Sequence, residues 1–272
     1  MQTNFEFEFT DRHFTDISSL VTKKTGIELP LHKKNLVYAR LVRRLRELKL
    51  TSFDSYLDHV KTNLNTELEP LVNAITTNVT SFFREPHHFD HLLTTALPDL
   101  QEKFGAIKLW CAAASTGEEP YTLAITAKEY KGAKPLQLSI IASDLDSAAL
   151  AKGQKGQYTI DPDTLKKHPL LKQFSDETST PNLRQMNSSL QSMLRFQQIN
   201  LMDPTWPISG PVHVVFCRNC VIYFSKDTQR KLFARIAELM PSGGYLYLGH
   251  SESLLNVSTA FNNVSRTVYQ KI

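Results

Sequence analysis

The sequence has few of the features that mark several large classes of protein. Cysteine is scarce, with Cys111, Cys217 and Cys220 in 272 residues, and an odd count of this size does not make a disulfide framework. Glycine (10) and proline (13) are too few for a collagen-like or low-complexity chain. No run reaches the roughly 18 consecutive apolar residues of a membrane-spanning helix.

The amino terminus and the overall charge further narrow the classes of protein to which the chain could belong. The opening residues MQTNFEFEFTDRHF lack the basic and apolar regions of a signal peptide, so we expect a cytoplasmic chain with reduced thiols. The net charge of +4, from 31 basic and 27 acidic residues, is mild. Where the basic residues lie therefore matters more than their sum.

The sequence motifs of phosphate-binding loops, zinc metalloproteases and serine hydrolases are also missing. The chain contains no GxxxxGK[ST], HExxH or GxSxG segment. Cys217 and Cys220 have CxxC spacing, but zinc normally needs two more ligands and a redox pair normally begins a helix. We therefore expect no metal, and we assign no metal role to the pair His87-His88 or to His250.

The first 90 residues have the periodicity of a small helical domain and a linker. Phe14, Ile17 and Val21 recur at helical spacing, with Thr15 or Asp16 as the expected cap and Gly26 as the expected end. Further helices are expected over 31–48, around 56–60 and around 68–75.

After about residue 97, short β-rich runs alternate with helical stretches, which indicates an α/β fold with a parallel sheet. Strands are expected at 107–111, 138–142, 212–217 and 245–248, with a final edge strand at 267–272. Helices are expected near 120–127, 148–152 and 227–240. Residues 156–196 interrupt this rhythm with prolines and a polar tract, and we expect an insertion, either a small antiparallel lobe or a long loop.

The small-residue turn after the first strand, AAASTGEEP, is the first candidate site. Ala113, Ser115 and Gly117 stand where a dinucleotide or adenosyl loop often has glycines. Glu118 and Glu119 would repel a pyrophosphate but attract a cationic amino group. The sequence therefore favours an adenosine that carries an amino acid over NAD or ATP, with an ordinary strand-to-helix turn as the alternative.

Three further segments carry polar residues at expected strand ends or linkers. Asp144 ends the second strand, where a carboxylate typically accepts hydrogen bonds from ribose hydroxyls, and either it or Asp146 is expected to cap the next helix. Arg84, in TTNVTSFFRE, has the planar fork that suits a carboxylate, although it could also pair within a linker. Asn219 follows the strand ending in FCRNC, at the sheet edge where α/β proteins place ligands.

Together, the segments TTNVTSFFRE, AAASTGEEPYT, ASDLD, FCRNCVIYF and GHSESL resemble the chemotaxis receptor methyltransferase (CheR) family in order and spacing. The resemblance implies an all-α amino-terminal domain at 1–90 and a Rossmann-like class I methyltransferase domain at 91–272 with a small inserted β-subdomain at 156–196. It also implies S-adenosylmethionine as cofactor, S-adenosylhomocysteine as product, and the cytoplasmic domains of chemotaxis receptors as partners. By the same resemblance, the cofactor-binding residues are Asn78, Thr80, Arg84, Ala113, Gly117, Glu118, Glu119, Asp144, Asn200, Leu201, Asn219 and Cys220.

The implied reaction suits a site without a catalytic base. A glutamate acceptor, with a pKa near 4.3, is already ionised at neutral pH, so the enzyme has only to align it with the methyl group. Arg84 and Tyr223 are the expected catalytic residues, with Arg84 limited to orientation. The basic residues Lys33, Arg40, Arg43, Arg44 and Arg46 are expected to dock acidic receptor helices, unless they form an ordinary solvated helix face.

Two rival functions remain at this point. An RNA methyltransferase could use the same basic residues on phosphates, but the chain has no NPPY-like motif and no basic stripe interleaved with aromatic residues. A non-catalytic adaptor could keep the fold and bind cofactor or receptor without turnover. We expect a catalytic monomer that binds no nucleic acid and does not insert into membranes.

Overall fold

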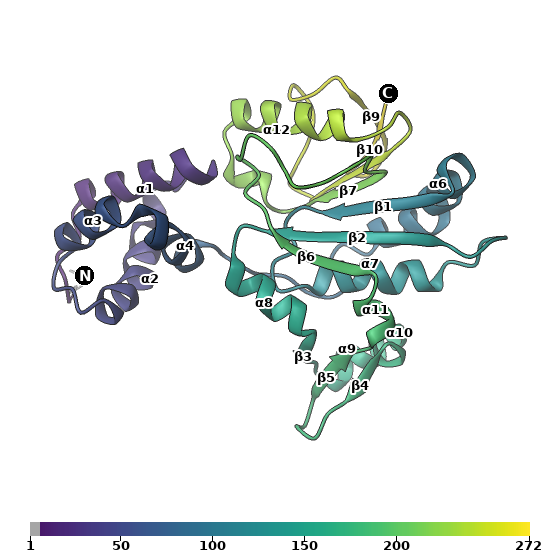
Figure 1. Cartoon of the computed structure of the whole chain (residues 1–272), viewed down its shortest axis with the longest axis horizontal. Coiled ribbons are helices and arrows are strands. Elements are labelled where there is room, and N and C mark those ends of the chain that lie inside the picture. The colour runs from purple at the N-terminus through teal and green to yellow at the C-terminus, as the bar shows by residue number, and fades with distance from the viewer. Residues whose placement is uncertain (1–5) are drawn as a thin grey trace.

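The computed structural model describes residues 6–272, and the first five residues of the expected helical domain lie outside the described part. A bundle of four helices and one short 3-10 turn stands on one side of a large sheet (Figure 1). Its elements are α1 (Asp11–Thr25), η1 (Leu31–Lys33), α2 (Lys34–Glu47), α3 (Phe53–Thr62) and α4 (Leu64–Ile75). The expected helices are therefore present.

The first helix begins earlier than expected. Thr10, and not Thr15 or Asp16, is its amino-terminal cap: the Thr10 hydroxyl accepts from the backbone N–H of His13 at 3.2 Å, and the His13 ring accepts from the Thr10 N–H. This reciprocal pair forms a capping box in which histidine takes the place of the usual glutamate or glutamine. The expected end is confirmed, because Gly26 adopts the left-handed conformation with φ 75°.

Inside the bundle, one carboxylate is buried among apolar side chains. Glu67 of α4 accepts from the guanidinium of Arg44 on α2, at 2.8 Å to Oε1 and 2.6 Å to Oε2. Glu67 also accepts from the Tyr56 hydroxyl at 3.2 Å. This bidentate ion pair joins α2 to α4, so Arg44 has a structural role within the bundle.

The large sheet has seven strands in the order β6-β2-β1-β7-β8-β10-β9. The first five are parallel to their neighbours, and β10 runs antiparallel to both β8 and β9. This order confirms the expected Rossmann-like α/β sheet. The strands are β1 (Ala106–Cys111), β2 (Gln137–Asp144), β6 (Leu194–Gln198), β7 (Val214–Cys217), β8 (Tyr245–Leu248), β9 (Phe261–Ser265) and β10 (Val268–Lys271).

Two details of the sheet differ from the expectation. The carboxy-terminal strand β10 is not at the edge, because β9 pairs with its outer side. Strand β6 begins at Leu194, inside the range expected for the insertion, and pairs with β2. Its sequence LRFQQ has only a weak apolar pattern, which is why the sequence did not reveal it.

Side chains that alternate along the strands face two different helical layers. Leu109 and Cys111 share a core with the helices on one face, and Trp110 shares a core with the helix on the other. The first layer contains α5 (His87–His91), η2 (Leu92–Ala96), α6 (Leu97–Phe104), α7 (Glu118–Glu129) and α8 (Ser147–Lys155). The second contains α12 (Lys226–Leu239).

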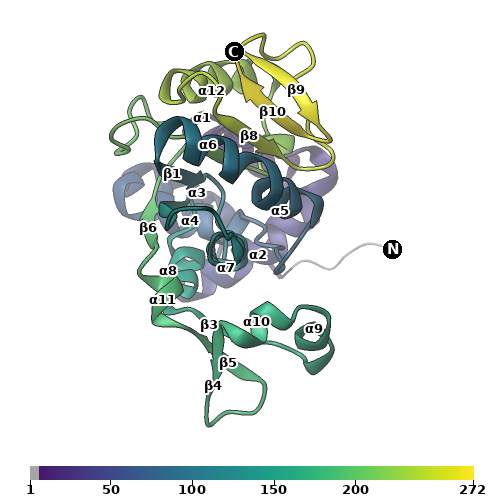
Figure 2. The ribbon, with the colours of Figure 1, turned by 90° about the vertical axis from the view of Figure 1, so that its right-hand side faces the viewer.

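The insertion is a small subdomain with an antiparallel sheet in the order β3-β5-β4, so the lobe and not the loop is present. It projects from the large sheet beside α8 (Figures 1 and 2). Its elements are β3 (Gln157–Thr159), α9 (Pro162–Lys167), α10 (Pro169–Gln173), β4 (Ser175–Glu177), β5 (Leu183–Met186) and α11 (Ser188–Gln191). Across residues 6–272, no helix has both the length and the apolar character to cross a membrane.

The helical bundle is bound to the sheet through direct contacts. The Asn200 amide donates to the carbonyl of Lys24 at 2.8 Å, and the N–H of Glu28 donates to the carbonyl of Tyr223 at 2.8 Å. Ile27 and Phe224 form an isolated β-bridge beside them. The segment after α1 therefore lies against the carboxyl ends of the strands.

The Arg44–Glu67 pair gives a stability prediction. Arg44→Ala is expected to lower the free energy of unfolding by about 3 kcal/mol, because it leaves a buried carboxylate without its main partner. Arg43→Ala removes an exposed pair with Glu47 and is expected to cost less than about 0.5 kcal/mol. Urea unfolding of both variants measures the difference, and equal losses would contradict a structural role for Arg44.

Candidate functional site

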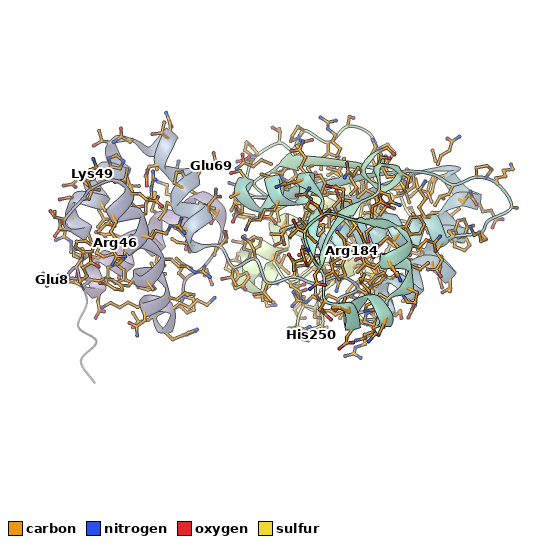
Figure 3. All side chains as sticks on the ribbon, turned by 90° about the horizontal axis from the view of Figure 1, so that it is seen from below. Glu8, Arg46, Lys49, Glu69, Arg184 and His250 are labelled. Atoms are coloured by element: carbon orange, nitrogen blue, oxygen red, sulfur yellow. The ribbon has the colours of Figure 1, made fainter. Side chains whose placement is uncertain are left out.

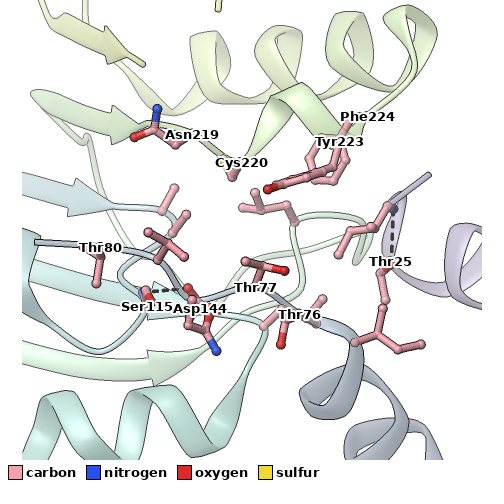
Figure 4. A pocket seen from close by; sticks show the side chains of 18 of the residues that line it. Thr25, Thr76, Thr77, Thr80, Ser115, Asp144, Asn219, Cys220, Tyr223 and Phe224 are labelled. Atoms are coloured by element: carbon pink, nitrogen blue, oxygen red, sulfur yellow. Dashed lines mark hydrogen bonds between the residues drawn. The ribbon is translucent and has the colours of Figure 1, made fainter. Parts of the chain in front are cut away.

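A cavity lies where the carboxyl ends of β1, β2 and β7 meet the helical bundle (Figure 4). Its walls come from four places in the chain: the bundle, the linker after α4, the loops after the strands, and the segment after β6. Most of the expected site residues line it. They are Asn78, Thr80, Arg84, Ala113, Glu119, Asp144, Asn200, Leu201, Asn219, Cys220 and Tyr223.

The carboxylate of Asp144 is held by the backbone around it. Its Oδ2 accepts from the N–H of Ser115 at 2.7 Å, and its Oδ1 accepts from the N–H of Asp146 at 2.9 Å. Burial raises the pKa of Asp144, and these backbone hydrogen bonds oppose the rise. Figure 4 shows Asp144 and Ser115 joined at the cavity wall. The position of the carboxylate is therefore set before any ligand binds.

The two glutamates expected to bind the cofactor, Glu118 and Glu119, face different cavities in the structure. Glu119 lines the cavity, whereas Glu118 faces a second cavity and accepts from the Thr116 hydroxyl at 2.6 Å. Gly117 does not line the first cavity either. Its φ is 99°, and a Cβ there would lie 2.5 Å from the Tyr158 hydroxyl, so this glycine serves close packing against the subdomain.

Arg218, which the sequence analysis did not single out, is central to the site. Its side chain is fully buried, with Nη1 2.7 Å from Glu119 Oε2 and Nη2 3.4 Å from Glu85 Oε2. Nη2 also donates to the backbone carbonyl of Arg84 at 2.6 Å. Burial raises the pKa of Glu119, and the nearby guanidinium of Arg218 opposes that rise.

The linker after α4 is attached to the start of α8. Asp146 caps α8 by accepting from the N–H of Ala149 at 2.9 Å, so it is the capping aspartate of the expected pair. Its Oδ2 also accepts from the Thr76 hydroxyl at 2.8 Å and the Asn78 amide at 2.7 Å. Farther along the linker, Arg84 donates to the carbonyl of Val79 at 3.0 Å. The linker is therefore a fixed wall of the cavity.

Glu252, in the GHSESL segment, organises the loop after β7. Its buried carboxylate accepts from the backbone N–H groups of Asn219 at 2.9 Å, Val221 at 3.0 Å, Ile222 at 3.3 Å and Gly249 at 2.6 Å. This loop presents Asn219, Cys220 and Tyr223 to the cavity. The sequence analysis used the GHSESL segment only for the family resemblance and did not predict this role of Glu252.

The expected receptor-docking residues are mostly engaged within the chain. Arg40 donates to the carbonyls of Ile75 and Thr76, Arg43 pairs with Glu47, and Arg46 pairs with Glu6. Lys33 lies 4.7 Å from the centre of the Tyr223 ring. Of the five residues, Lys33 and Arg40 line the cavity. The sequence pattern alone could not show these pairings.

Two groups of potential metal ligands lie close to the site. Glu85, His87 and His88 bring three ligand atoms within 4.8 Å of one another, but Arg218 lies 3.4 Å from Glu85 and its charge opposes a cation. Burial and then the charge of Arg218 lower the pKa of His88 to about 3. The sulfurs of Cys217 and Cys220 are 3.4 Å apart as free thiols. Neither group gives us reason to assign a metal.

Comparisons with known proteins find matches to this chain over nearly its whole length. Residues 78–270 match the family model described as CheR methyltransferase, SAM binding domain, and residues 12–76 match the CheR methyltransferase, all-alpha domain. The chain is 40% identical to chemotaxis protein methyltransferase 2 of Pseudomonas aeruginosa, covering 98% of this chain and 95% of that protein. It is 38% identical to the chemotaxis protein methyltransferase of Salmonella typhimurium, covering 99% and 93%, and 36% identical to that of Escherichia coli, covering 99% and 94%.

The electrostatics of Glu85 give a pH prediction. Burial alone would raise the pKa of Glu85, but the hydrogen bond with His250 and the charge of Arg218 lower it to about 2. Because this value lies below the ordinary 4.5, the stability that Glu85 contributes is present above pH 4.5 and is lost as the pH falls toward 2. We expect Glu85→Gln to be less stable than the unmodified chain at pH 7, and the gap to close over that range.

Urea unfolding at a series of pH values measures this gap. Glu129→Gln, which changes an exposed carboxylate of α7, is the control and should follow the unmodified chain throughout. A gap for Glu85→Gln that stays constant from pH 7 to pH 2 would show that the Glu85 charge is not the cause.

Proposed function

Because the chain belongs to the CheR methyltransferase family, we propose that it methylates glutamate side chains of chemotaxis receptors. Membership of this family makes it a methyltransferase that uses S-adenosylmethionine. The products are a glutamate methyl ester and S-adenosylhomocysteine. The observation that carries the proposal is the match of residues 78–270 to the cofactor-binding family model, whose matched segment contributes most of the cavity wall.

The residues present fit this cofactor. Ala112, Ala113 and Ser115 form a wall of small side chains that allows a ligand close to the backbone, and the Ser115 hydroxyl is buried without a partner in the described chain. The Asp144 carboxylate keeps free lone pairs besides its two backbone hydrogen bonds. Glu119 adds a second carboxylate on the same side.

We assign binding roles from this arrangement. Asp144 would hold the ribose hydroxyls, and Asn200 and Leu201 would lie beside the adenine. Glu119, with Asn78, Thr80 and Arg84, would hold the amino-acid end, and the loop with Asn219 and Cys220 would close the site. Glu118 and Gly117 have no binding role in this assignment. Glu118 lines the second cavity, and Gly117 packs against α8.

Bound S-adenosylmethionine supplies a methyl group on a positively charged sulfur. The chain has to exclude water and align the acceptor, which is ionised at neutral pH and needs no base. Ile27, Leu29 and Val37 of the bundle form an apolar wall of the cavity and lower the local dielectric. Arg84 and Tyr223 lie at the same cavity and would orient the acceptor carboxylate.

The organisation of the chain is part of the proposal. We propose a helical domain and linker at 1–90 and a methyltransferase domain at 91–272. The insertion, expected at 156–196, ends before β6 begins at Leu194. The two family models meet between residues 76 and 78, which supports a junction in the linker. We also propose that the enzyme acts as a monomer on the cytoplasmic part of receptors and does not bind nucleic acid.

A labelling experiment tests the function. The chain, methyl-labelled S-adenosylmethionine and receptor-containing membranes are incubated together, and the label is expected on a receptor-sized protein. Mild base should release it as methanol, because carboxyl esters hydrolyse readily whereas methylated amines do not. Label on RNA would contradict the proposal, and cofactor binding without any transfer would favour a non-catalytic adaptor.

The binding roles give a second prediction. Asp144→Ala is expected to weaken S-adenosylhomocysteine binding about 100-fold, since two hydrogen bonds to a charged acceptor contribute about 3 kcal/mol. Arg84→Ala should lower kcat more than it weakens cofactor binding. Calorimetry and initial rates measure both, with Glu118→Gln as the control that retains cofactor affinity. Unchanged affinity in Asp144→Ala would refute the ribose assignment.

A further inference from the structure

The loop after β7 forms one wall of the cavity at the carboxyl ends of the strands. It contributes Asn219, Cys220 and Tyr223, which Figure 4 shows along the same side of the cavity. Tyr223 is the last residue of the short 3-10 helix η3 (Val221–Tyr223). Because so short an element has little rigidity of its own, the direction of the Tyr223 side chain depends on what holds the backbone beneath it.

The N–H groups of this loop are held by a carboxylate from a neighbouring loop. Glu252 is 5% exposed and lies in the segment after β8. Figure 3 shows His250, from the same segment, on the methyltransferase domain and apart from the helical bundle. Glu252 Oε2 accepts from the N–H of Asn219 at 2.9 Å, and Oε1 accepts from the N–H groups of Val221 at 3.0 Å and Ile222 at 3.3 Å. One carboxylate therefore spans the loop.

The carbonyl groups of the same loop have separate partners. The side-chain amide of Gln229 on α12 donates to the carbonyls of Val221 at 2.9 Å and Phe224 at 3.0 Å. The N–H of Glu28 donates to the carbonyl of Tyr223 at 2.8 Å. These are hydrogen bonds between neutral groups, whereas those to Glu252 have an ionisable acceptor and are the stronger kind. Glu252 is therefore the strongest of these polar anchors.

A carboxylate suits this position because both of its oxygens accept hydrogen bonds and neither has to donate. Besides the three N–H groups of the loop after β7, Glu252 accepts from the N–H of Gly249 at 2.6 Å. Burial raises the pKa of Glu252, and its backbone hydrogen bonds oppose that rise. A glutamine of the same size would offer a single accepting oxygen and would turn its NH₂ group toward other donors. Some N–H groups of the loop would then lose their partner.

The turn at Asn219 is the part of the loop that depends most on this anchor. The φ of Asn219 is 57°, in the left-handed region that residues other than glycine rarely adopt. The N–H of Asn219 donates to Glu252, and its side-chain amide donates to Glu85 at 3.4 Å. Loss of the Glu252 bond would let this turn relax toward an ordinary backbone conformation, and the residues that follow it, including Tyr223, would move.

We propose that Glu252 is a positioning residue for methyl transfer and acts through Tyr223. Its carboxylate does not line the cavity, and it fixes the backbone that directs Tyr223 toward the acceptor. Because transfer requires the acceptor, the methyl group and the sulfur to be aligned, a displacement of about 1 Å lowers the rate steeply. This inference rests on the proposed function, because it concerns the alignment of that function's acceptor.

Two substitutions of Glu252 test this role. Initial rates of base-labile transfer to receptor-containing membranes are measured at saturating substrates, per cofactor-binding site counted by calorimetry, so that unfolded chain does not contribute. We expect Glu252→Gln to lower kcat on the order of 100-fold. The Kd for S-adenosylhomocysteine should rise less than about fivefold, because Asp144 and Glu119 lie outside the loop. Glu252→Asp keeps the charge, and its kcat should lie between those of Glu252→Gln and the unmodified chain.

A double-variant cycle tests whether Glu252 acts through Tyr223. Tyr223→Phe should lower kcat by itself. In Glu252→Gln/Tyr223→Phe the fall in kcat should be close to that of the larger single change, because the second substitution removes a group that the first has already displaced. Two falls that multiply would show that the residues act independently, and the inference would be wrong.

Glu67→Gln is the matched control for a loss of stability. It also changes a buried carboxylate to an amide, but within the bundle, where Glu67 accepts from Arg44 and Tyr56. Urea unfolding should show that Glu67→Gln is destabilised, while its kcat per binding site is kept. The inference also fails if Glu252→Gln keeps kcat, if Glu252→Asp is slower than Glu252→Gln, or if Glu67→Gln loses kcat equally. An unmodified chain that transfers no base-labile methyl group would reject the proposed function, and this role of Glu252 with it.

Discussion

The arrangement of the site depends on one buried positive charge. Arg218 has no exposed side-chain surface, and an unpaired guanidinium in that position would cost several kcal/mol. Its partners are Glu119 at the start of α7, Glu85 in the linker, and the carbonyl of Arg84. Because all three must stay close to one guanidinium, the loop after β7, the linker and α7 adopt a single mutual arrangement. These three elements form part of the wall of the cavity at the carboxyl ends of the strands.

Much of this framework could be predicted from local patterns in the sequence. Short apolar runs predicted five strands of the large sheet, and the small residues after β1 marked a turn that allows a ligand near the backbone. Asp144 was found because a strand end fixes the sheet edge at which its carboxylate must lie. Such signals depend only on residues that are close in the sequence, so they can be recognised without a structure.

The features that the sequence did not reveal depend on contacts between distant segments. Arg218 meets residues 99 and 134 positions away, and nothing local marks it as buried. Whether Glu118 or Glu119 faces the cavity depends on the direction in which α7 begins. Two consecutive residues at the start of a helix point in different directions, so a shift of one residue would change the answer. The α2 arginines look like a free basic stripe until the carboxylates that reach them from other elements are seen. Strand β9 pairs outside β10, although the pattern of the final strand suited an edge.

The double use of Asp146 has a consequence for how the chain folds. One carboxylate caps α8 and also holds Thr76 and Asn78, so the helix that follows β2 and the end of the bundle share an anchor. Melting either part removes hydrogen-bond partners from the other. The bundle and the sheet therefore share an anchor although each has its own apolar core, and we expect their unfolding to be coupled.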